Sequence, residues 1–153
     1  MRQEVTGMAV TMEQLAAQAS PEAVALARLI LEHDLSDRAW AAQIGPAATQ
    51  RDTARLLGKS EQAVSKDARL VRVHTRDGRP VYPLVQFDGR GLLPGVGDVV
   101  AVLAPVMATP LSIAAWLTGA HPELAGRRPV DVLRSGSLEA VLDAARRFAA
   151  TAV

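Results

Sequence analysis

The tightest constraint on the fold is a turn at Gly58, which separates two segments that each predict a short helix. Thr49 can accept a hydrogen bond from the free amides at the start of the first helix, and Gly58 supplies the left-handed residue that commonly ends a helix. Ser60 can cap the second helix only two residues later. Two helices joined so closely must cross steeply, which is the geometry of a DNA-reading helix-turn-helix.

The second helix, expected over residues 61–70, carries polar side chains on one face. At about 3.6 residues per turn, Val64, Ala68 and Val71 fall on the opposite face, where they can pack. Exposed amide and cationic groups suit the major groove of DNA, where base edges offer hydrogen-bonding atoms. A face that meets only solvent is the alternative. The predicted DNA-binding residues are Gln62, Ser65, Lys66 and Arg69 on the helix, with Lys59 and Ser60 at the turn.

A β-hairpin that can serve as a wing is predicted after the second helix. Asp77-Gly78 signals a two-residue type I′ turn, which needs positive φ at both positions. The expected opposite pairs are Arg76–Arg79, His74–Val81 and Val73–Tyr82. Like charges that face each other destabilise a sheet, and DNA phosphate beside Arg76 and Arg79 would remove that cost. We therefore expect both arginines to contact the DNA backbone.

Positive charge is concentrated on the segment that contains these elements. Residues 49–90 hold nine Lys or Arg against five Asp or Glu, a net charge of +4. Residues 1–48 hold three against six, a net charge of −3, and residues 91–153 hold five against five. This distribution is expected of a protein that contacts nucleic acid. Because a surplus of about four charges gives modest affinity, we expect a homodimer that doubles the contacts.

The composition indicates a globular protein with aliphatic cores. Of the 153 residues, 49% are hydrophobic but only 3% are aromatic, so each helix buries little apolar area and we expect stability to come partly from self-association or a partner. The absence of cysteine fits a reducing cytosol. There is no run of about 18 apolar residues and no signal-like start, so we expect a cytoplasmic protein without a membrane span.

No residue pattern predicts catalysis, a metal site or a cofactor. The three histidines, His33, His74 and His121, lie in separate elements without the spacing of metal ligands. The glycines between residues 91 and 97 are not followed by the Lys-Ser/Thr pair of a phosphate-binding loop. No serine lies in a nucleophile elbow. We expect no enzyme activity, and an unrecognised enzyme is the remaining alternative.

The predicted fold class is mainly α, in three regions. Residues 1–35 form N-terminal helices that can dimerise, residues 36–90 form the winged helix-turn-helix, and residues 91–153 form a small helical bundle. Pro21 occupies the first position of the main N-terminal helix, and Ser36 caps a separate helix over residues 37–44. Residues 88–95 are expected to be a linker.

The bundle is expected to contain four helices with a distinctive sequence between them. The last helix, capped by Ser137, places Asp143 and Arg147 as an i, i+4 ion pair. The distinctive features are Trp116-Leu117, HPELAGRRPVDVL from His121 to Leu133, Gly136, and Val141-Leu142 in the last helix. On these features residues 91–153 resemble the toxin-binding domain of the Xre/MbcA/ParS antitoxin family. The predicted wing is closer to MerR-like or excisionase-like winged helices than to the wingless Xre type.

The resemblance implies the antitoxin of a type II toxin–antitoxin pair. In such pairs the usual partner is a RES-domain toxin that consumes NAD, and the antitoxin covers the entry to the toxin's active site while binding its own operator DNA as a dimer or within the toxin complex. The predicted toxin-binding residues are Trp116, Arg127, Arg128, Arg146 and Arg147. The last two lie near the chain end and could enter a pocket for an anionic dinucleotide, or they could be helix-end cations favoured by the macrodipole.

A stand-alone winged-helix transcriptional regulator is the alternative function. Its C-terminal bundle would then serve dimerisation or bind a small ligand, and no toxin would be needed. A toxin gene next to this one would separate the two hypotheses.

Overall fold

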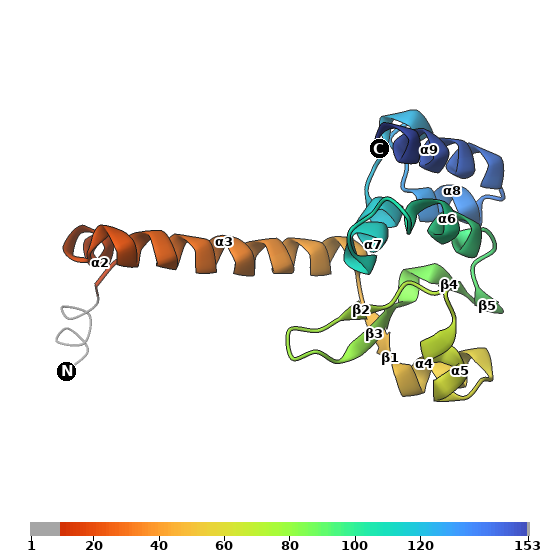
Figure 1. Cartoon of the computed structure of the whole chain (residues 1–153), viewed down its shortest axis with the longest axis horizontal. Coiled ribbons are helices and arrows are strands. Elements are labelled where there is room, and N and C mark those ends of the chain that lie inside the picture. Colours follow the sequence, from red (N-terminus) through yellow and green to blue (C-terminus); the bar gives the residue numbers. More distant parts are fainter. Residues whose placement is uncertain (1–9, 153) are drawn as a thin grey trace. The chain divides into compact units, whose positions relative to one another are not determined.

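The computed structural model describes residues 10–152, without the side chains of His33 and Ser36. The chain divides into two compact units, Met1–Ala39 and Trp40–Val153. The described residues form helices and a small antiparallel sheet with a hairpin wing, so the predicted mainly α fold class is confirmed (Figure 1).

The first unit consists of α2 (Met12–Gln18) and most of α3 (Pro21–Ile44). As predicted, Pro21 opens α3. The separate helix predicted over residues 37–44 is wrong, because α3 continues without a break to Ile44. No glycine or proline interrupts this segment, and Arg38 bridges to Asp34 across the expected break at 3.0 Å. A serine alone therefore does not end a helix whose backbone can continue.

In the second unit, α4 (Gln50–Leu57) and α5 (Glu61–Lys66) form the predicted helix-turn-helix. Gly58 ends α4 in the left-handed conformation, with φ of 64°. The side chains of Thr49 and Ser60 each accept a hydrogen bond from a backbone N–H of the following helix at 3.1 Å. Val64 is buried, as the sequence predicted, and Ala54 of α4 is buried as well.

The end of α5 differs from the prediction. The helix was expected to reach Leu70 but ends at Lys66, because Asp67 leaves the helical region with ψ of 103°. The Asp67 carboxylate accepts a hydrogen bond from the backbone N–H of Arg69 at 3.0 Å, which stabilises a turn instead of another helical turn. Ala68 consequently lies exposed instead of packing beside Val64.

Three short strands form one antiparallel sheet in the order β1-β3-β2, from β1 (Ala47–Thr49), β2 (Val73–His74) and β3 (Pro80–Pro83). The predicted wing register is wrong by one residue, since Val73 lies opposite Val81 and His74 opposite Pro80. Gly78 has φ of 84°, but Asp77 does not have positive φ, so a type I′ turn cannot form. Thr75 N–H instead donates to the Arg79 carbonyl at 2.9 Å, so Arg76 and Arg79 are not opposite.

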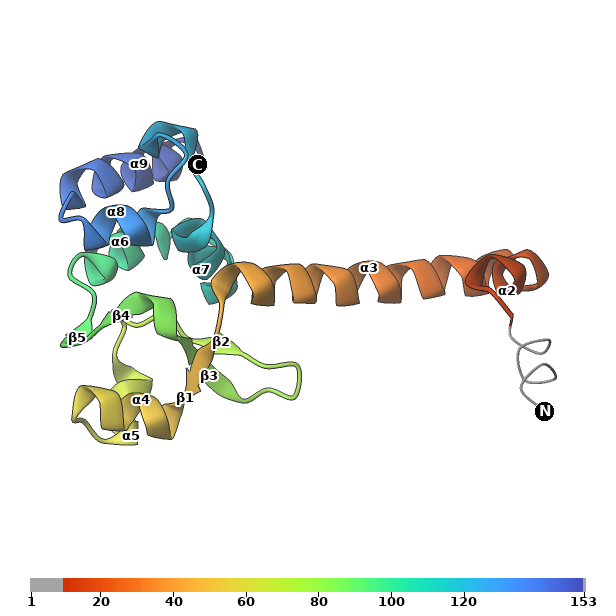
Figure 2. The ribbon, with the colours of Figure 1, turned by 180° about the vertical axis from the view of Figure 1, so that it is seen from behind.

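The rest of the second unit holds the four predicted helices, and Figure 2 shows them from behind. They are α6 (Val96–Leu103), α7 (Pro110–Thr118), α8 (Pro129–Arg134) and α9 (Leu138–Thr151), with 3-10 turns at η1 (Leu84–Gln86) and η2 (Pro122–Leu124). The predicted linker at residues 88–95 contains part of a hairpin, β4 (Phe87–Asp88) with β5 (Gly91–Leu92).

One hydrophobic core extends from the helix-turn-helix region into the C-terminal helices. Ile44 and Val71 belong to the same buried cluster as Val99, Trp116 and Val141. A smaller cluster of Ala54, Val64, Leu70, Tyr82 and Phe87 lies beneath α4 and α5. The helix-turn-helix region is therefore packed against the C-terminal helices through buried aliphatic contacts.

A buried glutamine fixes the chain between α5 and the wing. Gln86 is 1% exposed, and its Oε1 accepts a hydrogen bond from Val71 N–H while its Nε2 donates to the Val71 carbonyl, both at 2.8 Å. Arg134 of α8 donates to the neighbouring Val85 carbonyl at 2.7 Å. The two Gln86 bonds satisfy the buried backbone groups of Val71, which no strand partner reaches.

Candidate nucleic-acid interface

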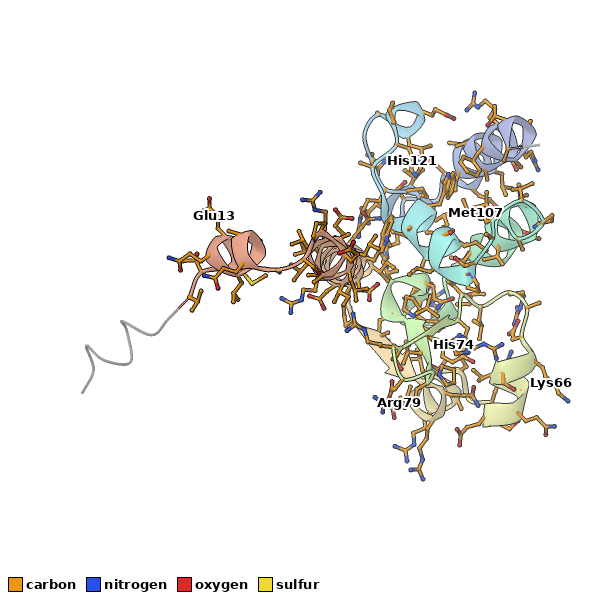
Figure 3. All side chains as sticks on the ribbon, turned by 60° about the vertical axis from the view of Figure 1, so that its left-hand side comes forward. Glu13, Lys66, His74, Arg79, Met107 and His121 are labelled. Atoms are coloured by element: carbon orange, nitrogen blue, oxygen red, sulfur yellow. The ribbon has the colours of Figure 1, made fainter. Side chains whose placement is uncertain are left out.

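The exposed surface of α5 presents two of the predicted DNA-reading side chains to solvent. Gln62 and Lys66 are exposed, and Figure 3 shows Lys66 projecting away from the fold. Among the described residues Lys66 has no ion-pair partner. Ser65 is half-buried and its hydroxyl donates to the Gln62 carbonyl at 2.9 Å. Gln62 and Lys66 are therefore the members of the predicted face with the fewest competing contacts.

A carboxylate restrains two further predicted cations, Lys59 and Arg69. Asp67 pairs with Arg69 at 2.8 Å and with Lys59 at 3.6 Å, and only 10% of its side chain is exposed. The hydrogen bond from Arg69 lowers the pKa of Asp67 to about 2, although partial burial opposes the change. The same hydrogen bond raises the pKa of Arg69. Asp67 thus holds both cations at the edge of α5 and offsets part of their charge.

The wing carries exposed cations at its tip. Arg79 pairs with Asp77 at 3.0 Å and keeps 74% of its side chain exposed, and Arg76 is also exposed. Thr75 donates a short hydrogen bond to Asp77, and this bond is the main reason that the pKa of Asp77 is lowered. The tip therefore offers two guanidinium groups, one of them beside an ionised carboxylate.

A hollow of about 320 Å³ lies between α5 and the wing, and its cationic lining was missed from the sequence. Lys66, Arg72 and His74 line it together with Ser65 and Asp67. Arg72 Nη1 donates to the Ser65 carbonyl at 3.1 Å, which ties the strand to the end of α5. The sequence gave no reason to join Arg72 and His74 to Lys66.

The predicted toxin-binding residues lie on several elements of the bundle. Trp116 is 7% exposed and belongs to the core, and its carbonyl accepts a hydrogen bond from His121 Nε2 at 2.8 Å. Arg128 pairs with Asp131 at 2.7 Å, and this contact lowers the pKa of Asp131 and raises that of Arg128. Arg127 is exposed, and its Nη2 donates to the Asp131 carbonyl at 3.4 Å.

The predicted ion pair between Asp143 and Arg147 is wrong. Asp143 pairs with Arg146 at 3.5 Å, and Arg147 pairs with Glu123 of η2 at 3.3 Å. Tertiary packing of η2 against α9 supplies the nearer carboxylate, which helical spacing alone could not reveal. Both arginines remain largely exposed on α9.

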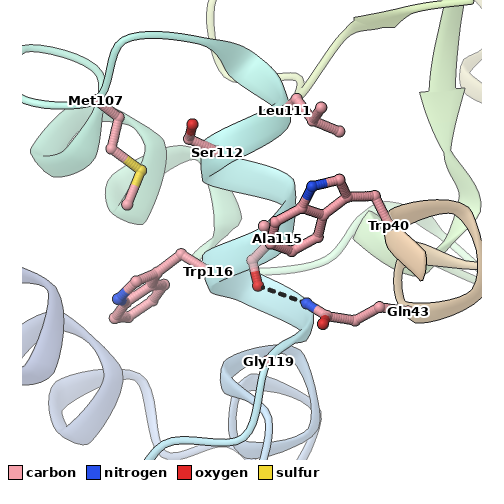
Figure 4. Close-up of a pocket in the computed structure, with 8 residues that line it drawn as sticks. All are labelled: Trp40, Gln43, Met107, Leu111, Ser112, Ala115, Trp116 and Gly119. Atoms are coloured by element: carbon pink, nitrogen blue, oxygen red, sulfur yellow. Dashed lines mark hydrogen bonds between the residues drawn. The ribbon is translucent and has the colours of Figure 1, made fainter. Parts of the chain in front are cut away.

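An apolar hollow of about 440 Å³ lies between the end of α3 and α7 (Figure 4). Trp40, Met107, Leu111 and Trp116 supply most of its apolar lining, and no charged side chain lines it. Gln43 Nε2 donates to the Ala115 carbonyl at 3.0 Å and so fixes this end of α3 against α7. The sequence did not predict this hollow.

Residues 10–152 contain neither a metal-binding cluster nor a membrane-spanning helix. No group of histidine and acidic side chains in that range could hold a metal ion. None of the helices there combines the length and apolar character that crossing a bilayer requires.

Comparison with known proteins gives one informative likeness. No protein-family model matches the chain, and no curated protein matches it. Among solved structures, the NMR structure of Rv2175c is similar, with a TM-score of 0.60 and 24% sequence identity. The match covers 68% of this chain and 81% of that chain. At this level of identity the likeness shows a shared fold.

Proposed function

We propose that this protein is a DNA-binding transcriptional regulator that places α5 in the major groove and the wing on the phosphate backbone. The observation that carries the proposal is the capped α4–α5 turn, which holds Gln62 and Lys66 exposed beside a hollow whose lining includes the cations Lys66 and Arg72 and the carboxylate Asp67. The amide of Gln62 can form hydrogen bonds with base edges in the major groove, and the ammonium group of Lys66 can contact bases or phosphates. The proposed function is DNA binding and involves no catalytic residue.

The wing and the hollow supply the sequence-independent part of binding. Lys66, Arg72 and His74 can surround one phosphate, while Arg76 and Arg79 can meet the neighbouring backbone. Arg69 and Lys59 contribute less, because each would have to leave Asp67 to reach DNA. We therefore rank Lys66 above Arg69 as a DNA contact.

The test is the binding of fluorescent duplex DNA selected from a random pool by the full chain. Lys66→Ala should weaken binding, and the slope of log affinity against log salt should fall by about one unit for the lost phosphate contact. Arg146→Ala is the matched control, because Arg146 is an exposed cation on α9 with one acidic neighbour. Equal affinity and an unchanged slope for Lys66→Ala would exclude the assigned interface.

A finer function is proposed on the resemblance of residues 91–153 to the Xre/MbcA/ParS toxin-binding domain. The regulator would be an antitoxin that neutralises a RES-type, NAD-consuming toxin, forms a hetero-oligomer with it and represses their shared operon. Two local features support it: Pro129 opens α8, and Gly136, with φ of 88°, precedes α9. The guanidinium groups of Arg146 and Arg147 are exposed on α9, each beside one carboxylate.

Co-expression tests this finer function. If a RES-like toxin is encoded beside this gene, co-expression with the full chain should restore growth, and Arg147→Glu should reduce rescue while DNA binding is retained. Truncation at Gly91 is a poor test, since it would remove most of the core on which Val71 packs. Absence of rescue by a well-folded full chain would leave the stand-alone regulator as the function.

A further inference from the structure

The N-terminal helices present an unusual number of large apolar side chains to solvent. Five of them lie within three turns of α3, and each is 48% to 64% exposed. We call these five the apolar collar; they are Leu26, Leu29, Ile30, Leu31 and Leu35. Contiguous exposed apolar surface of this kind marks an interaction site.

The collar surrounds the helix. Residues 23–31 contain a single charged side chain, Arg28. At about 100° per residue, Leu31 and Leu35 fall beside Val24, whereas Leu26 and Leu29 fall on the opposite side. A helix that is apolar all round is normally buried, and a helix without packing partners is marginal in water. The collar therefore requires a cover.

Charge and length exclude two kinds of cover. No described helix is long and apolar enough to cross a membrane. Residues 10–39 carry five acidic residues against two arginines, a net charge of −3, which disfavours anionic lipid surfaces and nucleic acid. The cover must be a protein surface that is apolar and tolerates acidic neighbours.

We infer that a second copy of this chain covers the side of the collar that holds Leu31 and Leu35, with α3 antiparallel to its copy. In an antiparallel pair, residues whose numbers add to about 59 lie at the same level, so Val24 meets Leu35 of the second copy and Leu31 meets the stem of Arg28. Arg28 and Glu32 lie on the same flank of this stripe, and each guanidinium then reaches Glu32 of the other copy.

The opposite orientation lacks this complementarity. A parallel pair in register would place Arg28 level with Arg28 of the second copy and Glu32 level with Glu32. The antiparallel pair alternates the signs and gives a closed two-fold dimer, in which the same patch serves both copies. A dimer also presents two α5 helices to two DNA half-sites, a use that rests on the proposed function.

Sedimentation equilibrium of the full chain without DNA tests the dimer. Wild type should be dimeric at micromolar concentration, and Leu31→Glu combined with Leu35→Glu should weaken the dimer at least about 100-fold, because two charges would be buried in each helix. Leu56→Glu is the matched control, since Leu56 on α4 is 48% exposed, as is Leu31. Circular dichroism and thermal unfolding establish that each variant folds.

Charge reversal and a cysteine test the orientation. Arg28→Glu should weaken the dimer about tenfold, and adding Glu32→Arg should restore it, as expected when an attractive pair is reversed. The chain has no cysteine, so Leu35→Cys reports direction. Antiparallel helices separate the two sulfurs by about 16 Å along the axis and prevent a disulfide, whereas parallel helices bring them together.

Each outcome is decisive. A monomeric wild type at all concentrations, or a dimer that survives both collar substitutions, would overturn the inference. A Leu35→Cys disulfide would overturn the antiparallel arrangement. A dimer that behaves as expected but fails to bind DNA would overturn the proposed function and leave the dimer intact.

Discussion

Replacing Gln86 with leucine should destabilise the second unit severely, although the two side chains are similar in size. Gln86 pairs with both the N–H and the carbonyl of Val71 at 2.8 Å, and all three groups are buried. Leucine would leave the two backbone groups without partners, and each unsatisfied group costs about 1–3 kcal/mol. The expected loss is about 2–6 kcal/mol, a large part of the roughly 5–15 kcal/mol that stabilises a domain.

The pH dependence of a Gln86→Glu variant distinguishes the contributions of the two hydrogen bonds. An ionised carboxylate can still accept from Val71 N–H but cannot donate to the Val71 carbonyl, whereas the protonated acid can do both. The pKa of the introduced carboxyl should therefore be raised in the folded state. A raised pKa means that the folded state holds the extra proton, so the stability of the variant relative to wild type should increase as pH falls from 7 towards about 4.

Urea unfolding at several pH values measures both effects. The midpoint should fall in Gln86→Leu with little change in the dependence on urea, since the surface exposed on unfolding is unchanged. A loss below about 1 kcal/mol in Gln86→Leu would refute the claim that these bonds satisfy buried groups. A Gln86→Glu variant with the same pH profile as wild type would refute the geometry assigned to the carbonyl bond.

Two further predictions concern Asp67 and the glycines of the bundle. Because the folded-state pKa of Asp67 is about 2 rather than 3.8, its ion pairs should stabilise the protein by about 2 kcal/mol above pH 4, and this contribution should disappear as pH falls towards 2. Acid titration of the unfolding free energy should show that decline in wild type and not in Asp67→Asn. Gly95→Ala should cost about 2–5 kcal/mol in chemical denaturation, since its φ is 94° and the new methyl would lie 2.6 Å from Leu138 Cδ1. Gly136→Ala, with φ of 88° and open space, should cost only about 1–2 kcal/mol, and equal costs would contradict the clash at Gly95.

The elements that the sequence predicted correctly depend on local chemistry. Thr49, Gly58 and Ser60 act within one turn of their own helices, so their residue types were enough to place α4 and α5. The same holds for Pro129 at the start of α8. Caps and turn residues are informative because their hydrogen bonds involve near neighbours along the chain.

The wrong predictions concern positions where the local conformation depends on several residues at once. The wing turn depends on whether Asp77 joins Gly78 at positive φ, and its bonds to Thr75 and Arg79 hold it in another turn. The break at Ser36 failed because nothing else stops α3. Strand β1 has the sequence Ala-Ala-Thr, which carries no strand signal and forms only because β3 is available beside it.

The candidate interface could be predicted only in part for a similar reason. The exposure of Gln62 and Lys66 was predicted correctly, because exposure on a short helix follows from spacing. The role of Asp67 in holding Arg69 and Lys59 needed coordinates, since α5 had to end before that contact could form. Arg72 and His74 join the site through the fold of the strand, which places them beside Lys66.

Ile44 and Val71 share their burial with Trp116 and Val141, and this has a consequence for how the protein can vary. If either the helix-turn-helix region or the C-terminal helices were exchanged for an unrelated module, aliphatic side chains of the other would become exposed to solvent. The second unit should therefore unfold in a single step. Substitutions of buried residues in α9 should also destabilise α5. Substitutions that the fold tolerates should therefore concentrate at exposed positions such as Gln62, which can change without disturbing the core.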